Sequence, residues 1–286
     1  MKICVTSYSF GHYQKENELG ILGIIDKAAE LGFDAIEYAE GAWTKSCAPT
    51  LPEQIRERAE ACGIAVAALC MGADFINGSD GDLDAEIERM KTWVDFAARM
   101  GASKLRHDIT RGFTGRKYSL GYDDALPRCA EATLAITQYA EEKGIETMTE
   151  NHGFFSQDAA RVEKLINAVA HPNFGALVDV GNFMCADENP NISVGLLAPY
   201  ARHVHAKDFF RKSGMLPHPG QGWFTTRGGN YLRGTIIGHG DADVYQSINI
   251  LKKSGYDGYI TVEFEGMEDN LLGIELGRKT LLSYLG

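Results

Sequence analysis

The chain reads Ala176-Leu177-Val178-Asp179-Val180-Gly181-Asn182 at one point and Arg202-His203-Val204-His205-Ala206-Lys207-Asp208 soon after it. Each stretch is a short apolar run that ends on a residue type found in metal sites, a carboxylate in the first and an imidazole in the second. Two flanking runs, 145–150 and 259–263, also end on a carboxylate. A parallel barrel gathers the carboxyl ends of its strands at one rim, so this pattern favours a site at such a rim.

The whole chain repeats this alternation of a short β-branched run with a longer segment of helical period. Eight such units predict a (β/α)8 TIM barrel. The expected strands are 3–7, 34–38, 64–70, 103–107, 145–149, 174–179, 202–206 and 258–263. The expected helices are 18–31, 51–62, 82–100, 122–143, 156–169, 190–198, 241–254 and 270–284.

Glycines mark the ends of several expected helices, which strengthens this interpretation. The sequences 29–32, 61–63, 99–101 and 142–144 each place a glycine directly before a strand, as helix C-termini commonly do. A doubly wound sheet would alternate in the same way. However, no G-x-G-x-x-G sequence follows the first strand, so a nucleotide-binding Rossmann domain is disfavoured. We therefore expect residues 1–286 to form a single barrel domain.

Composition and charge limit the kinds of binding partner and the cellular compartment that we expect for the protein. The chain has 28 Lys and Arg against 39 Asp and Glu, a formal charge of −11, which repels nucleic acid and anionic lipid. No segment has the length and apolar character of a membrane span, and the amino terminus does not resemble a signal peptide. The six cysteines, at 4, 47, 62, 70, 129 and 185, lack paired spacing, so we expect reduced thiols and a cytoplasmic, soluble protein.

The segment 209–240 after the seventh strand interrupts the regular alternation. It is long and rich in glycine, proline and aromatic residues, including Trp223. Long loops in compact domains are usually functional or disordered. The aromatic residues favour one of two roles, a lid over the barrel mouth or a contact in a homo-oligomer.

Four strand ends provide a mixed set of oxygen and nitrogen ligands. These are Glu150, Asp179, His205 and Glu263. Three carboxylates and one imidazole suit Mn²⁺ first, and also Mg²⁺, Co²⁺ or Zn²⁺. If the register of the last strand is off by one layer of inward-facing residues, Glu265 replaces Glu263 as the ligand. His203 is expected to be a structural histidine in the layer below the site. Further candidates for contact with a substrate are Glu37, His107, His152, Asn182 and Lys207.

These motifs in this order resemble the xylose isomerase-like TIM-barrel superfamily, in particular its sugar phosphate isomerase/epimerase branch. The sequences that carry the resemblance are 149–153, 178–182, 203–208, 260–263 and the Gly-x-Gly-x-x-Asp turn at 238–243. The resemblance implies a divalent metal held by the four residues above, with Glu150 and Glu263 acting also as acid and base. It further implies that Arg211 contacts substrate oxygens. One departure is Asn182, which stands where the ketose 3-epimerases of the group have histidine, so a free-ketose 3-epimerase is not favoured.

The expected activity is that of a metal-dependent sugar isomerase or epimerase. Abstraction of an α-proton from a ketose, aldose or related polyol ketone would give an enediolate, and the two glutamates would move the proton. Loss of a β-hydroxyl from the same enediolate would instead give an inosose-type dehydratase or lyase. Two alternatives from other classes are an endonuclease IV-like nuclease, which the negative charge disfavours, and a sugar- or metal-binding barrel without turnover.

Overall fold

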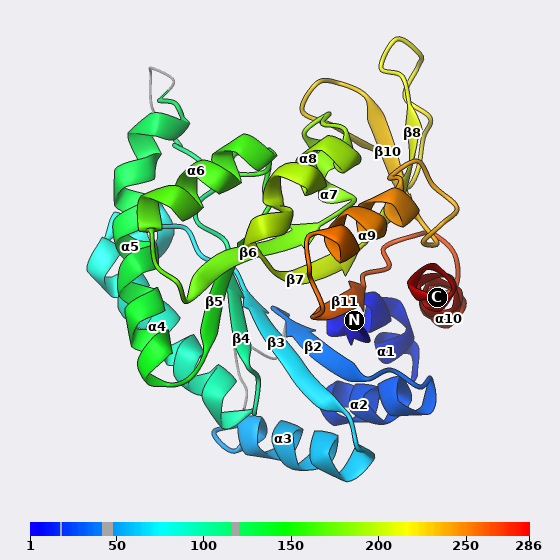
Figure 1. Ribbon diagram of the computed structural model, residues 1–286, viewed down its shortest axis with the longest axis horizontal. Coiled ribbons are helices and arrows are strands. Elements are labelled where there is room, and N and C mark those ends of the chain that lie inside the picture. The colour runs from blue at the N-terminus through cyan, green and yellow to red at the C-terminus, as the bar shows by residue number, and fades with distance from the viewer. Residues whose placement is uncertain (18, 42–47, 116–119) are drawn as a thin grey trace.

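Eight parallel strands close into a barrel in the computed structural model, which describes residues 1–17, 19–41, 48–115 and 120–286 (Figure 1). The barrel strands are β1 (Lys2–Thr6), β2 (Ala35–Ala39), β3 (Ala65–Met71), β4 (Lys104–His107), β5 (Glu146–Glu150), β6 (Phe174–Asp179), β7 (Ala201–Ala206) and β11 (Tyr259–Val262). Around the barrel their order is β1-β11-β7-β6-β5-β4-β3-β2. The predicted fold class and all eight predicted strands are therefore confirmed, and no strand end is displaced by more than one residue.

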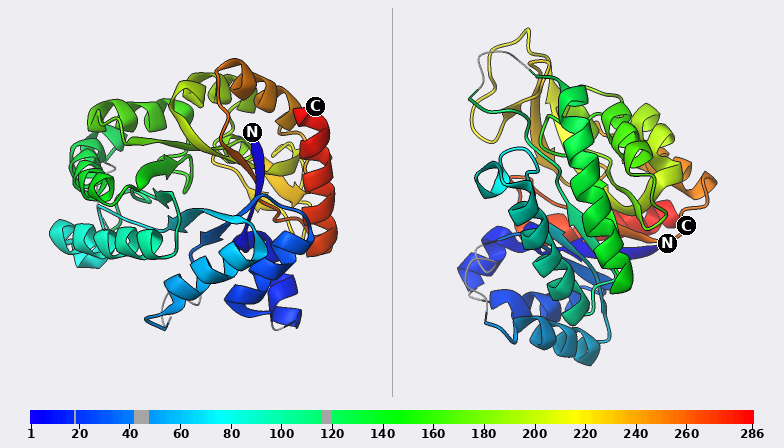
Figure 2. Two further views of the ribbon diagram at one scale, coloured as in Figure 1. Left: turned by 60° about the horizontal axis from the view of Figure 1, so that its bottom comes forward. Right: turned by 90° about the vertical axis from the view of Figure 1, so that its left-hand side faces the viewer.

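Helices surround this barrel on its outer side (Figures 1 and 2). The longer ones are α2 (Gly20–Glu30), α3 (Leu51–Cys62), α4 (Leu83–Arg99), α5 (Tyr122–Glu142), α6 (Ala159–Val169), α8 (Pro190–Leu197), α9 (Val244–Lys253) and α10 (Asn270–Leu285). Short turns of helix lie at η1 (Ser7–Phe10), α1 (Gly11–Asn17), η3 (Gly78–Gly81), α7 (Asn182–Cys185) and η4 (Ala198–Tyr200). The first of the predicted helices, 18–31, begins on a residue outside the described ranges.

Local capping explains where the helices differ from the sequence-based expectation. Gly63 adopts φ 70° after α3, a left-handed conformation that costs glycine little and closes the helix as predicted. Helix α6 begins at Ala159 and not at 156, because the Asp158 side chain accepts a hydrogen bond from the Arg161 N–H and acts as its N-cap. Helix α9 begins at Val244, because Asp243 before it has φ 52° and interrupts the helical backbone.

The segment 209–240, predicted to be an irregular loop, contains most of a small antiparallel sheet. Strand β8 (Asp208–Lys212) pairs with β10 (Tyr231–Thr235), which also pairs with the two-residue β9 (Phe224–Thr225). The sheet stands beyond the carboxyl ends of the barrel strands (Figures 1 and 2). Its strands are short and about twenty residues apart in sequence, so their pairing leaves no local periodic signal.

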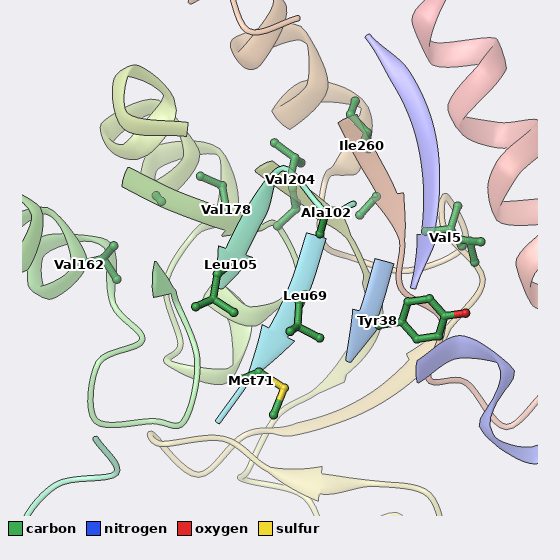
Figure 3. Packing of buried hydrophobic residues seen from close by; sticks show 14 of the residues in the cluster. Val5, Tyr38, Leu69, Met71, Ala102, Leu105, Val162, Val178, Val204 and Ile260 are labelled. Carbon is green, nitrogen blue, oxygen red and sulfur yellow. The ribbon is translucent and has the colours of Figure 1, made fainter. Parts of the chain in front are cut away.

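Strand alternation divides the core into an inner and an outer layer. Val5, Leu69, Val178, Val204 and Ile260 face the helices and belong to the main hydrophobic cluster (Figure 3). The neighbouring residues of the same strands point into the barrel, since successive side chains of a strand face opposite sides. Ala68, Cys70, Met148 and Leu177 accordingly form a separate cluster, which joins β3 with β5 and β6 across the interior. The inner positions at the carboxyl ends of the strands are polar, and they define the mouth of the barrel.

Asp208 connects the small sheet to the turn before α9. Its carboxylate accepts hydrogen bonds from the backbone N–H groups of Phe209, Gly238, Gly240 and Ala242, at 2.9–3.0 Å. A Cβ atom at Gly240 would lie 2.3 Å from Asp208 Oδ1, so the glycine allows this close approach. The Gly-x-Gly-x-x-Asp sequence is thus folded around a buried carboxylate.

The expectations about membrane spans and cysteines can also be compared with the structure. Within the described ranges, no helix combines the length and the apolar character needed to cross a bilayer. The cysteines that the structure describes, Cys4, Cys62, Cys70, Cys129 and Cys185, are free thiols, and Cys47 lies outside the described residues.

Candidate metal centre

The four predicted ligands meet at the barrel mouth. Glu150 ends β5, Asp179 ends β6, His205 lies in β7 and Glu263 follows β11. One ligand atom from each lies within 4.8 Å of the others. Because these strands are neighbours in the order β11-β7-β6-β5, the two glutamates stand at the ends of an arc with Asp179 and His205 between them. The side chains of Asp179, His205 and Glu150 are almost fully buried, and that of Glu263 is 13% exposed.

Unsatisfied ligand atoms show that this cluster fits a divalent ion. Asp179 Oδ2, His205 Nδ1 and Glu263 Oε2 are buried and make no hydrogen bond of good geometry, although charged atoms lie close to them. Buried polar atoms of this kind are costly unless something binds them. Burial and the neighbouring glutamates also raise the pKa of Asp179 to about 7, despite the nearby Lys207 ammonium. A cation bound by these atoms would satisfy them and remove the repulsion among the carboxylates.

Glu37 holds His205 from below the cluster. His205 Nε2 lies 2.7 Å from Glu37 Oε1, and its Nδ1 lies 2.7 Å from Glu263 Oε2. Nδ1 is therefore the nitrogen that faces the other ligands. Burial alone would lower the pKa of His205, but Glu37 and Glu263 raise it well above the ordinary value. Glu37, predicted to contact substrate, is itself fully buried and instead orients a ligand, as outer carboxylates do in metal sites.

His203 has the structural role expected of it. Its Nε2 lies 2.7 Å from both Glu37 Oε2 and Thr261 Oγ1, inside the barrel and one layer below His205. Burial lowers its pKa, against the effect of Glu37. The two histidines and Glu37 thus form a buried network that supports the floor of the site.

Asparagine side chains fix Asp179 through its backbone and Glu150 through its carboxylate. Asn151 donates from Nδ2 to the Asp179 carbonyl at 2.8 Å, and its Oδ1 accepts from the Asp179 N–H at 2.8 Å. Asn182 donates from Nδ2 to Glu150 Oε1 at 2.9 Å and accepts from Lys207 at 3.3 Å. Asn182 was among the predicted substrate contacts, whereas Asn151 was not, although it directly follows Glu150 in the sequence.

Lys207 places an ammonium group among the carboxylates. Its Nζ lies 3.1 Å from Asp179 Oδ2, 3.3 Å from Glu263 Oε2 and 3.5 Å from Glu265 Oε2. Burial alone would lower its pKa, but Asp179 and the glutamates raise it well above the ordinary value. Glu265 contacts Lys207 and does not belong to the four-ligand group, so the geometry favours Glu263 over Glu265 as the ligand.

Arg106, which the sequence reasoning missed as a site residue, pairs with the first ligand. Its guanidinium lies 2.5 Å from Glu150 Oε2 and 2.9 Å from Asp108 Oδ1. Asp108 in turn lies 3.0 Å from His152 Nδ1. Burial alone would lower the pKa of His152, but Asp108 raises it above the ordinary value. His152 is thus held at the edge of the mouth with its side chain 39% exposed, where a substrate could reach it.

His107 lies on the opposite side of its strand from Arg106. Its ring contacts Phe75 and Phe174, with centroids 5.6 and 6.1 Å away, and its side chain is fully buried. The structure therefore does not bring His107, predicted to contact substrate, to the ligands. The alternation of faces along β4 could have predicted this difference, because Leu105 and His107 share the outer face while Arg106 faces inward.

Arg211 and Trp223, expected over the substrate, lie in the small sheet. Arg211 lines a cavity with Met184, Asp187 and Asn230, and none of the four ligands borders it. Trp223 packs under the cations of Lys212 and Arg233, at 5.2 and 5.7 Å. Both residues therefore make contacts within or beside the sheet, and a role at the substrate stays a prediction.

Comparison with known proteins agrees with this fold. Residues 25–284 match the family model of the xylose isomerase-like TIM barrel. The chain is 26% identical over 144 residues to an inosose dehydratase of Lacticaseibacillus casei, an alignment that spans 50% of this chain and 48% of that protein. The chain thus spans about half the length of this relative.

Two solved structures superpose over nearly their whole length. The IOLI protein with a bound zinc atom has a TM-score of 0.76 at 17% identity, covering 100% of this chain and 98% of its own. An L-ribulose 3-epimerase has a TM-score of 0.73 at 16% identity, and the superposition covers 99% of this chain and 94% of that protein. Identities this low establish the fold alone. The family match, which covers most of the sequence, establishes that the chain belongs to the xylose isomerase-like TIM barrel family.

Proposed function

We propose that the protein is a divalent-metal-dependent sugar isomerase or epimerase that abstracts an α-proton from a polyol carbonyl compound. The observation that carries this proposal is the arc of Glu150, Asp179, His205 and Glu263, in which two glutamates flank the other two ligands. An ion bound there would polarise the substrate carbonyl and so acidify the neighbouring C–H. Mn²⁺ suits the three carboxylates and one imidazole best, and the zinc of the IOLI structure makes Zn²⁺ the first alternative.

The two glutamates differ in their surroundings, which suggests different roles. Glu150 is fixed by Arg106 at 2.5 Å and by Asn182 at 2.9 Å. Glu263 has no arginine partner among the described residues, and its side chain is the most exposed of the four. We assign proton abstraction first to Glu263. In an epimerase Glu150 would return the proton on the opposite face of the carbon.

The same asymmetry favours a second candidate, a dehydratase or other lyase. Elimination needs one base and one acid, in contrast to the two matched bases of an epimerase. Lys207 Nζ lies 3.3 Å from Glu263 Oε2, so a proton removed at the α-carbon and a proton donated to a departing β-hydroxyl could involve adjacent groups. The similarity to an inosose dehydratase supports this alternative.

A screen in deuterated water tests both candidates. Ketoses, aldoses and inososes are incubated with the protein and Mn²⁺, the ion is removed with EDTA, and the products are examined by NMR. We expect deuterium at the carbon next to the carbonyl. Retained hydroxyl groups would identify isomerisation or epimerisation, and loss of water would identify the dehydratase. Binding of sugars without any exchange would contradict the proposal and favour a non-catalytic barrel.

A further inference from the structure

A second group of possible ligand atoms meets inside the barrel, on the far side of His205 from the other three candidate ligands. It consists of Glu37 from β2, Cys70 from β3 and His205 from β7. One ligand atom of each residue lies within 4.8 Å of the others, and none of the three residues is more than 5% exposed. We call these residues the inner group. They share only His205 with the four-ligand centre.

The distances within the inner group are close to those around a bound ion. Cys70 Sγ donates to Glu37 Oε1 at 3.9 Å, and His205 Nε2 lies 2.7 Å from the same oxygen. Ligand atoms around a tetrahedral zinc lie about 3.4–3.6 Å apart, given bonds of about 2.1 Å to nitrogen or oxygen and about 2.3 Å to sulfur. Both contacts of Glu37 therefore need to change by less than about 1 Å to admit an ion.

The imidazole and the carboxylate of the inner group are prepared to bind a ligand. His205 Nε2 is buried and makes no hydrogen bond of good geometry, although it faces Glu37 Oε1. The other oxygen of Glu37 is fixed by His203 Nε2 at 2.7 Å and by Thr261 Oγ1 at 3.1 Å. A buried nitrogen without a hydrogen bond, beside a carboxylate that other side chains orient, is typical of a metal site.

The sulfur atom determines which ions the inner group prefers. Thiolate ligands select Zn²⁺ and softer ions, whereas Mg²⁺ and Mn²⁺ prefer oxygen ligands. The four-ligand centre contains no sulfur, so the two sets of ligands favour different ions. An uncharged imidazole has one nitrogen with a free lone pair. His205 can therefore bind an ion through Nε2 or through Nδ1, but not through both at once.

We propose that Cys70, Glu37 and His205 form a second metal site, which takes a thiophilic divalent ion such as Zn²⁺ or Cd²⁺ and prevents an ion from binding at the four-ligand centre. Cys70 releases its proton on binding, as thiol ligands do, and water completes the tetrahedron. His205 Nδ1 then carries the ring proton and donates it toward Glu263. The proposal involves no substrate, so it is independent of the proposed isomerase activity.

Cd²⁺ is the probe for this site, because a cadmium–thiolate bond absorbs in the ultraviolet and reports sulfur ligation directly. One equivalent is added to protein from which metal has been removed by EDTA and dialysis. The matched control is Cys185→Ser, since Cys185 is 6% exposed against 5% for Cys70 but belongs to no group of possible ligands in the described part of the chain. We expect the absorption band in the wild type and in Cys185→Ser, and its loss in Cys70→Ser.

A second measurement follows competition with Mn²⁺ by electron paramagnetic resonance of the released ion. One equivalent of Cd²⁺ should release Mn²⁺ from the wild type and from Cys185→Ser. In Cys70→Ser the same release should need at least roughly tenfold more Cd²⁺, the usual effect of losing a group that supports a metal site. Glu37→Gln should raise the Cd²⁺ concentration at half of the absorption band by about tenfold, and it serves as the test if Cys70→Ser does not fold.

Three outcomes would overturn the assignment. Absence of the band in the wild type at one equivalent of Cd²⁺ would show that the inner group does not bind the ion. A band that persists in Cys70→Ser, or that responds equally to Cd²⁺ in the wild type and in Glu37→Gln, would place the ion at another cysteine. Full retention of Mn²⁺ by wild-type protein that shows the band would show that both sites fill together and would contradict the exclusion.

Discussion

Glu150, Asp179, His205 and Glu263 are all candidate ligands, but their chemistry separates them into two pairs. The glutamates can bind an ion and also accept a proton. Glu150→Gln and Glu263→Gln should keep most of the metal and lose proton transfer, because an amide oxygen can still bind a cation but is a poor base. Asp179→Ala and His205→Ala should lose the ion, and their activity should partly return when the metal concentration is raised.

Deuterium exchange at the substrate α-carbon and metal analysis of each variant measure these two effects separately. Exchange at the wild-type rate in both glutamine variants would refute the assignment. The base would then be sought among His152, Lys207 and Glu265, of which the last two already contact each other at 3.5 Å.

His107 provides a test of acid stability. Burial lowers its pKa to about 4 from the ordinary 6.5, so between these values the unfolded chain binds a proton that the folded chain does not. The free energy of unfolding should therefore fall as the pH drops from 6.5 to 4, by on the order of 3 kcal/mol from this residue. The measurement is chemical denaturation of the wild type and His107→Gln across this range.

The difference in stability between the two proteins should shrink toward pH 4, since the variant lacks the titrating ring. His239→Gln, a change at an exposed histidine, is the control and should follow the wild type. A difference between wild type and His107→Gln that stays constant with pH would contradict the buried neutral state of His107.

Residue types at strand ends predicted which four side chains would meet at the mouth, because the barrel brings every strand end to one rim. They did not separate His107 from Arg106, since the choice depends on which face of β4 each residue occupies. A shift of the expected register by one residue would exchange the inner and outer faces of the strand. The four residues of β4, Lys104–His107, are too few to show from sequence which register is correct. The support of His205 by Glu37 was also hidden, because it joins β2 to β7 across the barrel interior.

At the scale of elements, Asp208 determines how the small sheet joins the barrel. It accepts four backbone hydrogen bonds, and removing it would leave buried N–H groups without an acceptor. Asp208→Ala should lower the free energy of unfolding by about 3 kcal/mol, at the upper end for hydrogen bonds to a charged group. Chemical denaturation measures this loss. Asp257→Ala, at an exposed position, should change stability by less than roughly 0.5 kcal/mol, and equal effects of the two changes would contradict the role of Asp208.

The helices and barrel strands were predictable from local patterns, and the β8-β10-β9 sheet was not. Helix ends carry their own signals, such as Gly63 after α3. In contrast, β8 and β10 pair through contacts such as Asp208 with Thr235 and Lys212 with Tyr231, which no local period reveals. The glycines and prolines between the strands indicated a loop, and this is correct for the connections 213–223, 226–230 and 236–240 but not for the three strands between them.

For the whole molecule, the alternation of strands and helices determined the barrel, and the barrel explains the site. Neighbouring strands carry the four candidate ligands, so predicting that these side chains meet needed no contact information beyond their order in the sequence. The cavity of about 910 Å³ beside α1 and α2 was not predictable, because its lining comes from segments as distant as η1 and the residues after β11. Its shape depends on how those loops fold and not on any motif.

The presence of a bound ion is the central claim, and metal content with thermal unfolding tests it most directly. An ion that binds only the folded chain stabilises it by roughly 2.7 kcal/mol at a hundredfold excess over its Kd. We therefore expect about one divalent ion per chain by elemental analysis, and a melting temperature several degrees lower after treatment with EDTA. Asp179→Ala should contain little metal, and its melting temperature should not respond to EDTA. An unchanged melting curve for the wild type in EDTA, with no metal in the untreated protein, would contradict the metal centre.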